Sequence, residues 1–171
     1  MQRVPLLLAM VLAACATQTP LATVPHVDLQ RYSGTWYEIA RYPNRFEGDC
    51  VAVCAAYAVR PDGRIDVLNA CRQGRFDGPA QEVRGVARAV EDASNAKLRV
   101  QFFWPFSGDY WIIGLDADYQ WAVVGTPSRD YLWILSRAPH MHGALYRQLV
   151  EDAAALGFDP GRLQLTAQPP P

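Results

Sequence analysis

The side chains best suited to chemistry in this chain of 171 residues are four cysteines and three histidines. His140 and His142 lie two residues apart and far from His26, which is not a metal-ligand spacing, and no carboxylate cluster accompanies them. The sequence also lacks Gly-x-Ser-x-Gly, a Gly-rich phosphate loop and Cys-x-x-Cys. It therefore predicts no metal site, no cofactor and no catalytic residue.

Cys15 ends a segment that is typical of exported proteins. A positively charged start, Met1-Gln2-Arg3, precedes an apolar run over residues 4–12. A membrane span needs about twenty apolar residues, so residues 1–14 are predicted to be a signal peptide instead. Leu12-Ala13-Ala14-Cys15 resembles the lipobox of bacterial lipoproteins, in which the cysteine thiol takes a diacylglycerol. The alternative is an ordinary signal peptide cleaved near Ala16.

The lipobox resemblance implies a membrane partner and a location. Acyl chains on Cys15 would form a stable anchor, since each buried methylene contributes about 0.8 kcal/mol. In bacterial lipoproteins an aspartate after the lipidated cysteine holds the product at the inner membrane, and this chain has Ala16 there. We therefore expect a lipid anchor in the outer membrane of a Gram-negative bacterium, on the periplasmic face.

Beyond Cys15 the chain divides into a tether and one domain. Residues 15–27 show neither period nor charge and are predicted to be a lipidated, flexible tether. Residues 28–171, about 145 in number, suffice for one domain with one core. The formal net charge is −1 and there is no basic run, so nucleic acid is not an expected partner.

The domain is expected to be all-β. Short strand-like runs separated by turn residues follow one another without a lasting helical period. Eight strands with short connections favour an antiparallel up-and-down β-barrel, because a sandwich usually needs longer crossovers. The expected strands cover residues 35–42, 50–59, 64–71, 81–90, 96–103, 109–116, 119–126 and 130–137.

Period-two alternation predicts which side chains face the barrel interior. Within residues 96–103 these are Leu98, Val100 and Phe102. Within residues 81–90 the inner side chains are small, namely Val83, Gly85, Ala87 and Ala89. An eight-stranded barrel with a small lining has room for one ligand, so a cavity is predicted. The alternative is that Phe102, Trp121 and Trp133 fill that space.

After residue 137 the pattern becomes helical. Pro139 can start a helix, and apolar residues recur at helical spacing until Gly157, at Leu145, Leu149, Ala153 and Leu156. A single apolar stripe predicts an α-helix packed outside the barrel. Residues 162–166 could add a short strand, before a frayed tail over 169–171. The connections at 43–49, 73–80, 104–108 and 127–129 share one end of the barrel, which is expected to be the mouth.

Three motifs in order resemble those of the lipocalin family. They are Tyr32-Ser33-Gly34-Thr35-Trp36-Tyr37-Glu38, then Leu115-Asp116-Ala117-Asp118-Tyr119, then Tyr131-Leu132-Trp133-Ile134-Leu135-Ser136-Arg137. The amino-acid sequence of residues 36–41 and 102–106 is similar to that of the bacterial outer-membrane lipoprotein lipocalins and of apolipoprotein D. The resemblance covers essentially the whole mature domain.

The resemblance implies both structural roles and a function. Trp36 would plug the base of the barrel, beside Gly34, with the guanidinium of Arg137 across its indole in a cation–π contact of about 0.5–2 kcal/mol. The implied ligands are fatty acids or lysophospholipids, bound in membrane maintenance or lipid transfer.

Candidate ligand contacts follow from the predicted facing and the position of the mouth. Glu38 would contact a headgroup or make an internal hydrogen bond, and Tyr110 would bind a phosphate or carboxylate or simply pack. Aromatic residues in a connection, Trp104 and Phe106, favour contact with a bilayer or an acyl chain over a local plug. The predicted ligand-binding set is Glu38, Ala87, Val100, Phe102, Trp104, Phe106, Tyr110, Ile112, Trp121 and Trp133.

Export also favours a disulfide, and lipidation of Cys15 leaves Cys50, Cys54 and Cys71. A tight turn at residues 62–63 would pair residues whose numbers sum to about 125, which places Cys54 opposite Cys71. The family resemblance instead implies a bridge between Cys50 and Cys71. The sequence leaves both pairings open.

Three functions compete. The first is a non-catalytic lipid binder, and the second is an enzyme on the same barrel, comparable to lipocalin-like isomerases and de-epoxidases, with the spare thiol as nucleophile. The third is a structural envelope protein without a saturable ligand. The sequence favours the lipid binder, and leaves open the headgroup and whether the chain forms a homodimer.

Overall fold

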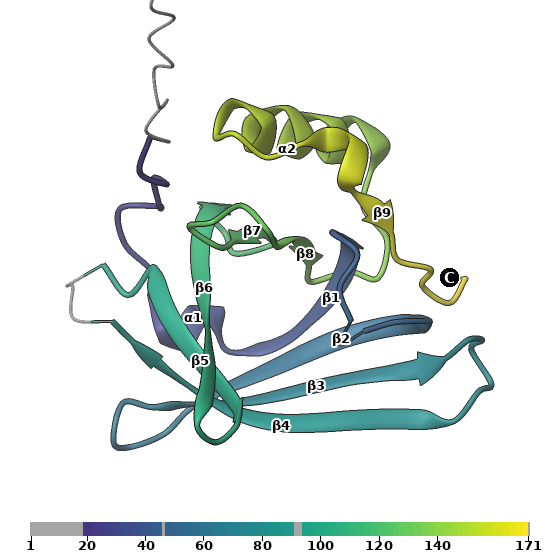
Figure 1. The fold of residues 1–171 in the computed structure, drawn as a ribbon, viewed down its shortest axis with the longest axis horizontal. Coiled ribbons are helices and arrows are strands. Elements are labelled where there is room, and N and C mark those ends of the chain that lie inside the picture. Colours follow the sequence, from purple (N-terminus) through teal and green to yellow (C-terminus); the bar gives the residue numbers. More distant parts are fainter. Residues whose placement is uncertain (1–18, 46, 91–93, 171) are drawn as a thin grey trace, which may run out of the picture.

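The computed structural model describes residues 19–45, 47–90 and 94–170, which form a closed antiparallel barrel with a helix outside it (Figure 1). Each strand pairs with the next in sequence, and pairing of the eighth strand with the first closes the ring. The predicted eight-stranded up-and-down barrel is confirmed. Its strands are β1 Gly34–Arg41, β2 Cys50–Val59, β3 Ile65–Gln73, β4 Ala80–Ala89, β5 Lys97–Phe103, β6 Phe106–Leu115, β7 Trp121–Gly125 and β8 Leu132–Ser136.

Alternation separates two apolar clusters on the two faces of the wall. The interior cluster is buried inside the barrel and comprises Val27, Tyr32, Trp36, Tyr57, Ile65, Val67, Ala87, Ala96, Leu98, Val100, Ile112, Tyr119, Ala122, Val124 and Leu135. The outer cluster lies between the wall and the C-terminal helix and comprises Leu21, Ile39, Ala40, Tyr42, Val123, Leu132, Ile134, Leu149, Ala153 and Phe158. The predicted inward facing of Leu98, Val100 and Ala87 is confirmed.

The hairpin between β5 and β6 is tighter than predicted. Phe103 pairs with Phe106, so only Trp104 and Pro105 form the turn and β6 begins at Phe106. The prediction of a loop over residues 104–108 was therefore wrong. Phe106 and Gly108 pair with β5, although the polar, Gly-containing sequence around them is typical of a connection.

The predicted flexible tether is wrong from Leu21 onward. Leu21 is buried in the outer cluster and Val27 in the interior cluster. A short helix that the sequence analysis missed, α1 (Leu29–Tyr32), follows, with the carboxylate of Asp28 accepting hydrogen bonds from the backbone N–H groups of Gln30 and Arg31. Leu21, Val24 and Val27 each pack against the barrel, and these contacts are enough to order a segment that has little secondary structure of its own.

The C-terminal helix α2 (Gly143–Ala155) packs its predicted apolar stripe onto the outer cluster. It begins later than Pro139 because His142 serves as its N-cap, where Nδ1 accepts from the N–H of Ala144. No helix in the described part of the chain combines the length and apolar character needed to cross a membrane.

The segment after α2 completes the barrel wall near the mouth. A 3-10 helix, η1 (Pro160–Arg162), leads into β9 (Gln164–Leu165), which pairs with Ala40 and Arg41 at the end of β1. The carbonyl of Ala167 then accepts a hydrogen bond from the N–H of Ala52 in β2 at 2.8 Å. Residues 164–167 therefore bridge β1 and β2 where those two strands diverge.

The disulfide joins Cys50 to Cys71 and leaves Cys54 free. The hairpin places Cys54 opposite Ala70, so Cys54 and Cys71 lie on opposite faces of the sheet. A bulge between Val51 and Cys54, with Ala52 at a φ of 51°, then reverses the facing of Cys50 and brings it to Cys71. The turn-register prediction was wrong by one residue, and the pairing implied by the family resemblance is confirmed.

Candidate functional site in the barrel interior

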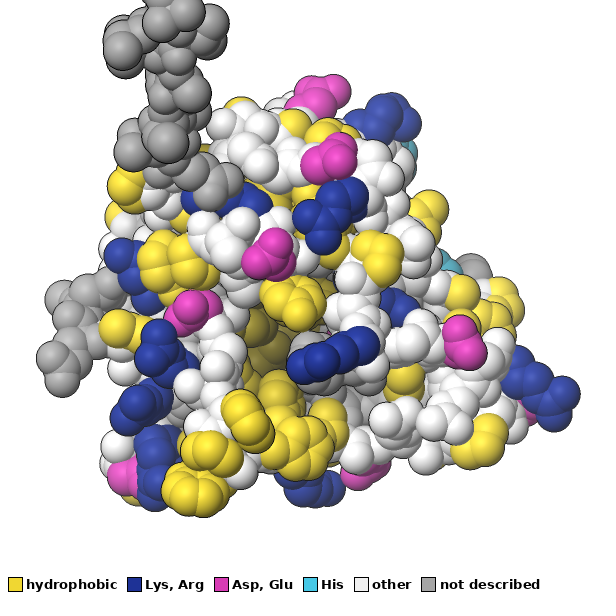
Figure 2. All heavy atoms as spheres, viewed as in Figure 1, with side chains coloured by type: hydrophobic (Ala, Val, Ile, Leu, Met, Phe, Trp, Pro, Cys, Tyr) yellow, Lys and Arg dark blue, Asp and Glu magenta, His cyan; other side chains and the backbone are white. Residues whose placement is uncertain are grey.

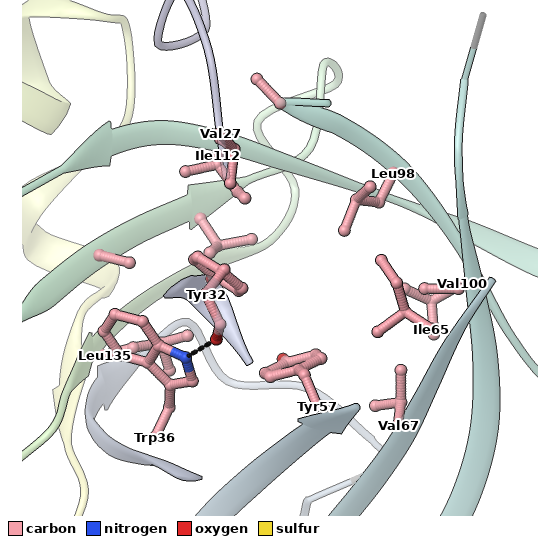
Figure 3. Close-up of a cluster of buried hydrophobic side chains, with 14 of the residues drawn as sticks. Val27, Tyr32, Trp36, Tyr57, Ile65, Val67, Leu98, Val100, Ile112 and Leu135 are labelled. Atoms are coloured by element: carbon pink, nitrogen blue, oxygen red, sulfur yellow. Dashed lines mark hydrogen bonds between the residues drawn. The ribbon is translucent and has the colours of Figure 1, made fainter. Parts of the chain in front are cut away.

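The barrel is hollowed at its open end. Figure 2 shows the hollow from the front, with hydrophobic side chains visible at its depth. Figure 3 shows the deeper part, where Ile65, Val67, Leu98 and Val100 point toward Tyr32 from the opposite side of the barrel. The interior is therefore lined by apolar side chains that converge toward the closed end.

The small residues on the inner face of β4 differ in what surrounds them. Ala87 is fully buried between Ile65 of β3 and Val100 of β5, its partners in the sheet. A Cβ atom added at Gly85 would lie 2.7 Å from the ring of Phe102, so this ring covers the glycine. The alternative that large neighbours fill the space left by small residues is therefore correct at Gly85.

Three tyrosines join hydroxyl groups inside the barrel. The hydroxyl of Tyr110 lies 2.8 Å from that of Tyr32 and accepts a hydrogen bond from Tyr57 at 3.0 Å. Burial raises the pKa of Tyr57 to about 12 and raises the pKa values of Tyr32 and Tyr110 well above the ordinary value, so all three hydroxyl groups remain neutral at physiological pH. Tyr110 faces inward as predicted, and its hydroxyl is engaged by protein partners.

A charged cluster lies on the inner face of β1 near the mouth. Arg41 Nη1 donates to Glu38 Oε1 at 2.6 Å, and its Nε lies 3.5 Å from Glu47 Oε2. Thr166 of the C-terminal segment also donates to Glu38. One guanidinium thus balances two carboxylates, and the internal hydrogen bond expected as one alternative for Glu38 is present.

Sequence reasoning missed Arg41 because simple alternation turns it outward. The pairing of β1 with β8 shifts between Glu38 and Ala40, so both Ile39 and Ala40 join the outer cluster and Arg41 faces inward beside Trp133. Arg41 also borders a recess of about 370 Å³ between the β1–β2 connection, the start of β2 and the C-terminal segment. No signal in the local sequence distinguishes this bulge from a regular strand.

We predict a pH dependence of stability from Glu38. Burial, followed by the charge of Glu47, raises the pKa of Glu38 from 4.5 to about 7, against the opposing effects of Arg41 and Thr166. Between these pH values the folded state binds more protons than the unfolded state, so the free energy of unfolding should fall as pH rises through this window. The loss should reach at most about 3 kcal/mol, and denaturant unfolding at pH 4.5, 6 and 8 measures it.

The matched variants for this test are Glu38→Gln and Glu47→Gln. Glu38→Gln should remove the slope, whereas Glu47→Gln should lower the pKa of Glu38 and move the slope to lower pH. An unchanged slope in Glu38→Gln would show that another group titrates.

Asn69 is a further polar residue of the barrel interior. It lies on β3 between Ala55 and Val83, on the inward face that carries Val67. Its side-chain oxygen is buried and has no hydrogen-bond partner among the described residues. A buried acceptor without a partner is costly, which makes Asn69 a candidate for binding a donor on a ligand.

The two tryptophans predicted to face the cavity lie on opposite sides of the wall. Trp133 faces inward, stacks on Tyr131 and donates from its indole nitrogen to Glu47 at 3.4 Å. The predicted inward facing of Trp121 was wrong. Ala122 and Val124 are the inward residues of β7, so Trp121 faces outward and packs against the outer cluster. Ile112 belongs to the interior cluster, as predicted.

Trp104 and Phe106 lie outside the interior, at the tip of the β5–β6 hairpin. Their side chains are 86% and 77% exposed. In Figure 2 hydrophobic side chains gather over this hairpin beside the hollow. They do not line the interior in this structure, and contact with a bilayer or with an acyl chain stays a prediction for them.

The lipocalin motif residues close the opposite end of the barrel. The guanidinium carbon of Arg137 lies 3.8 Å from the centre of the Trp36 ring, and the Trp36 indole donates to the carbonyl of Tyr32 at 2.8 Å. A Cβ atom at Gly34, whose φ is 94°, would lie 3.4 Å from Arg137 Nη1. All three residues have structural roles at this end, far from the mouth.

Two observations on the described residues concern metal binding and the free thiol. No group of three or more potential metal ligands occurs among them. Cys54 lies on the outer face of β2, opposite Ala70, and burial together with the charge of Glu82 raises the pKa of its thiol. A thiol that is protonated and outside the cavity is a poor nucleophile for an interior ligand.

An up-and-down barrel with a plugged base, an open apolar interior and one outer helix defines the lipocalin class. A family described as "Lipocalin-like domain" matches residues 27–168, and the chain belongs to the lipocalin family. The chain is 41% identical to "Outer membrane lipoprotein Blc" of Citrobacter freundii over 168 residues, covering 94% of this chain and 92% of that protein. It is 37% identical to apolipoprotein D of Macaca fascicularis, covering 67% of this chain and 62% of that protein.

Solved structures agree on the fold. Insecticyanin from the tobacco hornworm Manduca sexta superposes with a TM-score of 0.69 at 17% identity, covering 86% of this chain and 84% of that one. The resemblance to bacterial lipoprotein lipocalins and to apolipoprotein D, seen first in the motifs, is confirmed.

Proposed function

We propose that this lipocalin binds a single acyl chain, as a fatty acid or lysophospholipid, and stores or transfers it in the cell envelope without catalysing a reaction. The observation that carries the proposal is the apolar interior cluster beneath an open mouth (Figure 2). A chain of about sixteen carbons could gain on the order of 10 kcal/mol by leaving water, before the entropic cost of binding is subtracted.

The proposed chain site combines the apolar lining with a few polar groups. Ala87, Val100 and Ile112 would contact the chain at depth, and Phe102 and Trp133 would contact it nearer the mouth. Arg41 beside its recess and the free oxygen of Asn69 offer a cation and an acceptor for the headgroup. Glu38 would hold Arg41 in position through their ion pair, and Tyr110 would hold the hydroxyl group of Tyr32 through their hydrogen bond. This arrangement suits an amphiphile with one tail.

We further propose that the mature protein is anchored in the outer membrane through Cys15. Cys15 and the signal segment lie outside the described residues, so the support is the lipobox sequence and the relatives named as outer membrane lipoproteins. An enzymatic role on the same barrel is less well supported, because the only free thiol described faces away from the interior.

Titration of the unlipidated Cys15→Ser protein with palmitate and with a lysophosphatidylethanolamine tests this function. Both ligands should give a saturable change in tryptophan emission, since Trp133 lies in the interior wall. The change should fall strongly in Trp133→Phe and persist in Trp121→Phe, which alters the outer cluster. A linear, unsaturable response to both ligands would disprove acyl-chain binding.

A further inference from the structure

Exposed large apolar side chains gather at the open end of the barrel. Of the six found among the described residues, five belong to connections or strand ends at the mouth: Phe76, Phe103, Trp104, Phe106 and Leu165. The sixth, Val90, adjoins a closed-end connection. The concentration of these side chains at one end of the barrel favours an interaction surface around the mouth over random exposure.

The N-terminal segment is fixed along the barrel and begins at that same end. At the closed end the N–H of Val27 donates to Ser94, and further along the N–H of Val24 donates to Ile112 of β6. Leu21 is then buried in the outer cluster. Finally, Arg129 Nη2, in the β7–β8 connection at the mouth, donates to the carbonyl of Thr19 at 2.7 Å.

Arg129 links Thr19 to the end of α2 and to the β7–β8 connection. Its Nε donates to the carbonyl of Leu156 at the end of α2 at 3.2 Å, and its Nη1 donates to the carbonyl of Pro127 at 2.8 Å. In Figure 1 the described chain begins beside this end of α2. The position of Thr19 relative to the mouth is therefore fixed by side-chain contacts and not by a loose tether.

Chain length then limits where a lipid on Cys15 can lie. The four peptide units from Cys15 to Thr19 span at most about 14 Å. A ten-residue strand tilted as in a barrel spans about 25 Å from one end to the other. A lipid on Cys15 can therefore reach a membrane at the mouth, but not one at the closed end.

We propose that the open end of the barrel docks on the surface of the lipid bilayer that holds the anchor. The inference rests on the proposed lipid anchor and names the partner of the proposed site. The fixed N-terminal segment brings the mouth to the membrane, and Trp104, Phe106 and their neighbours enter the headgroup region, where aromatic side chains are favoured. An acyl chain then passes between the leaflet and the barrel without crossing bulk water.

The test uses lipidated, full-length mature protein in vesicles of phosphatidylethanolamine and phosphatidylglycerol whose acyl chains carry bromine, which quenches nearby tryptophan. Trp104 should be quenched, and Trp104→Ser should lose that quenching. The matched control is the double variant Asp62→Trp with Trp104→Ser, in which the exposed tryptophan lies in the closed-end turn. Its quenching should not exceed that of Trp104→Ser alone. Equal quenching at the two positions, or no loss in Trp104→Ser, would overturn the docking.

The possible failures are distinguishable. Both altered positions lie in exposed turns, and circular dichroism verifies that each variant folds. A protein that does not float with the vesicles lacks the anchor, which contradicts the proposed attachment and the docking that rests on it. A protein that floats and binds palmitate but shows no difference between the two reporters contradicts the docking alone.

Discussion

Ala87→Trp is expected to weaken the binding of palmitate and lysophospholipid by at least about 100-fold, or about 3 kcal/mol. Ala87 faces the deep interior between Ile65 and Val100, and its small methyl group is fully buried there, in the part of the barrel that the proposed acyl tail would enter. An indole there would occupy that space and exclude the tail. Isothermal titration of both ligands against the Cys15→Ser background measures the loss.

Two further variants keep this prediction falsifiable. Arg88→Trp places the same indole on the outer face of β4 one residue away, and its affinity should stay within a few-fold of the parent. Because overpacking can destabilise a core, Val83→Trp serves as a second inward variant, opposite Asn69 and nearer the mouth. If both inward variants fold and bind as tightly as Arg88→Trp, β4 does not line the ligand site.

Arg137→Ala is expected to lower the free energy of unfolding by about 3–5 kcal/mol, with a fall in Tm on the order of 10 °C. The guanidinium donates from Nη2 to the carbonyls of Arg31 and Ser33 and from Nη1 to that of Thr35, at 2.7, 2.9 and 2.8 Å. Truncation would leave these carbonyls without their charged donor and uncover the Trp36 ring. Urea unfolding followed by tryptophan emission measures the change.

Arg137→Lys provides the matched control. Lysine keeps the charge over Trp36 but cannot reproduce the planar set of donors, so it should recover only part of the stability. Palmitate affinity should stay within a few-fold of the parent in every folded Arg137 variant, because these contacts lie at the closed end. A large affinity loss in a fully folded variant would place the ligand site near Trp36 instead.

Much of the barrel was predictable because its determinants are local or periodic. The strands around Leu98 and Ala87 alternate cleanly, so their facing follows from the pleat. The stripe that includes Leu149 and Ala153 repeats at helical spacing, so an outer helix follows as well. Gly34, Trp36 and Arg137 lie in motifs whose order identifies the family, and their contacts at the closed end match that prediction.

The polar part of the candidate site was not predictable, because single-residue irregularities decide it. The register shift after Glu38 turns Arg41 inward, and the bulge at Ala52 brings Cys50 rather than Cys54 to Cys71. Each bulge reverses the facing of the residues on one side of it, and nothing in the local composition marks its position. Glu38 was found, but its partners were not.

The amino-acid sequence by itself determined the barrel, its outer helix, its small inner lining on β4 and its family, because short-range periodicity and motif order carry that information. Only the tertiary structure decided that Trp121 faces outward, that residues 164–167 seal the wall, and that Arg129 fixes Thr19 at the mouth. These features depend on contacts between residues far apart in the chain. Such contacts form only when the closed barrel brings their partners together.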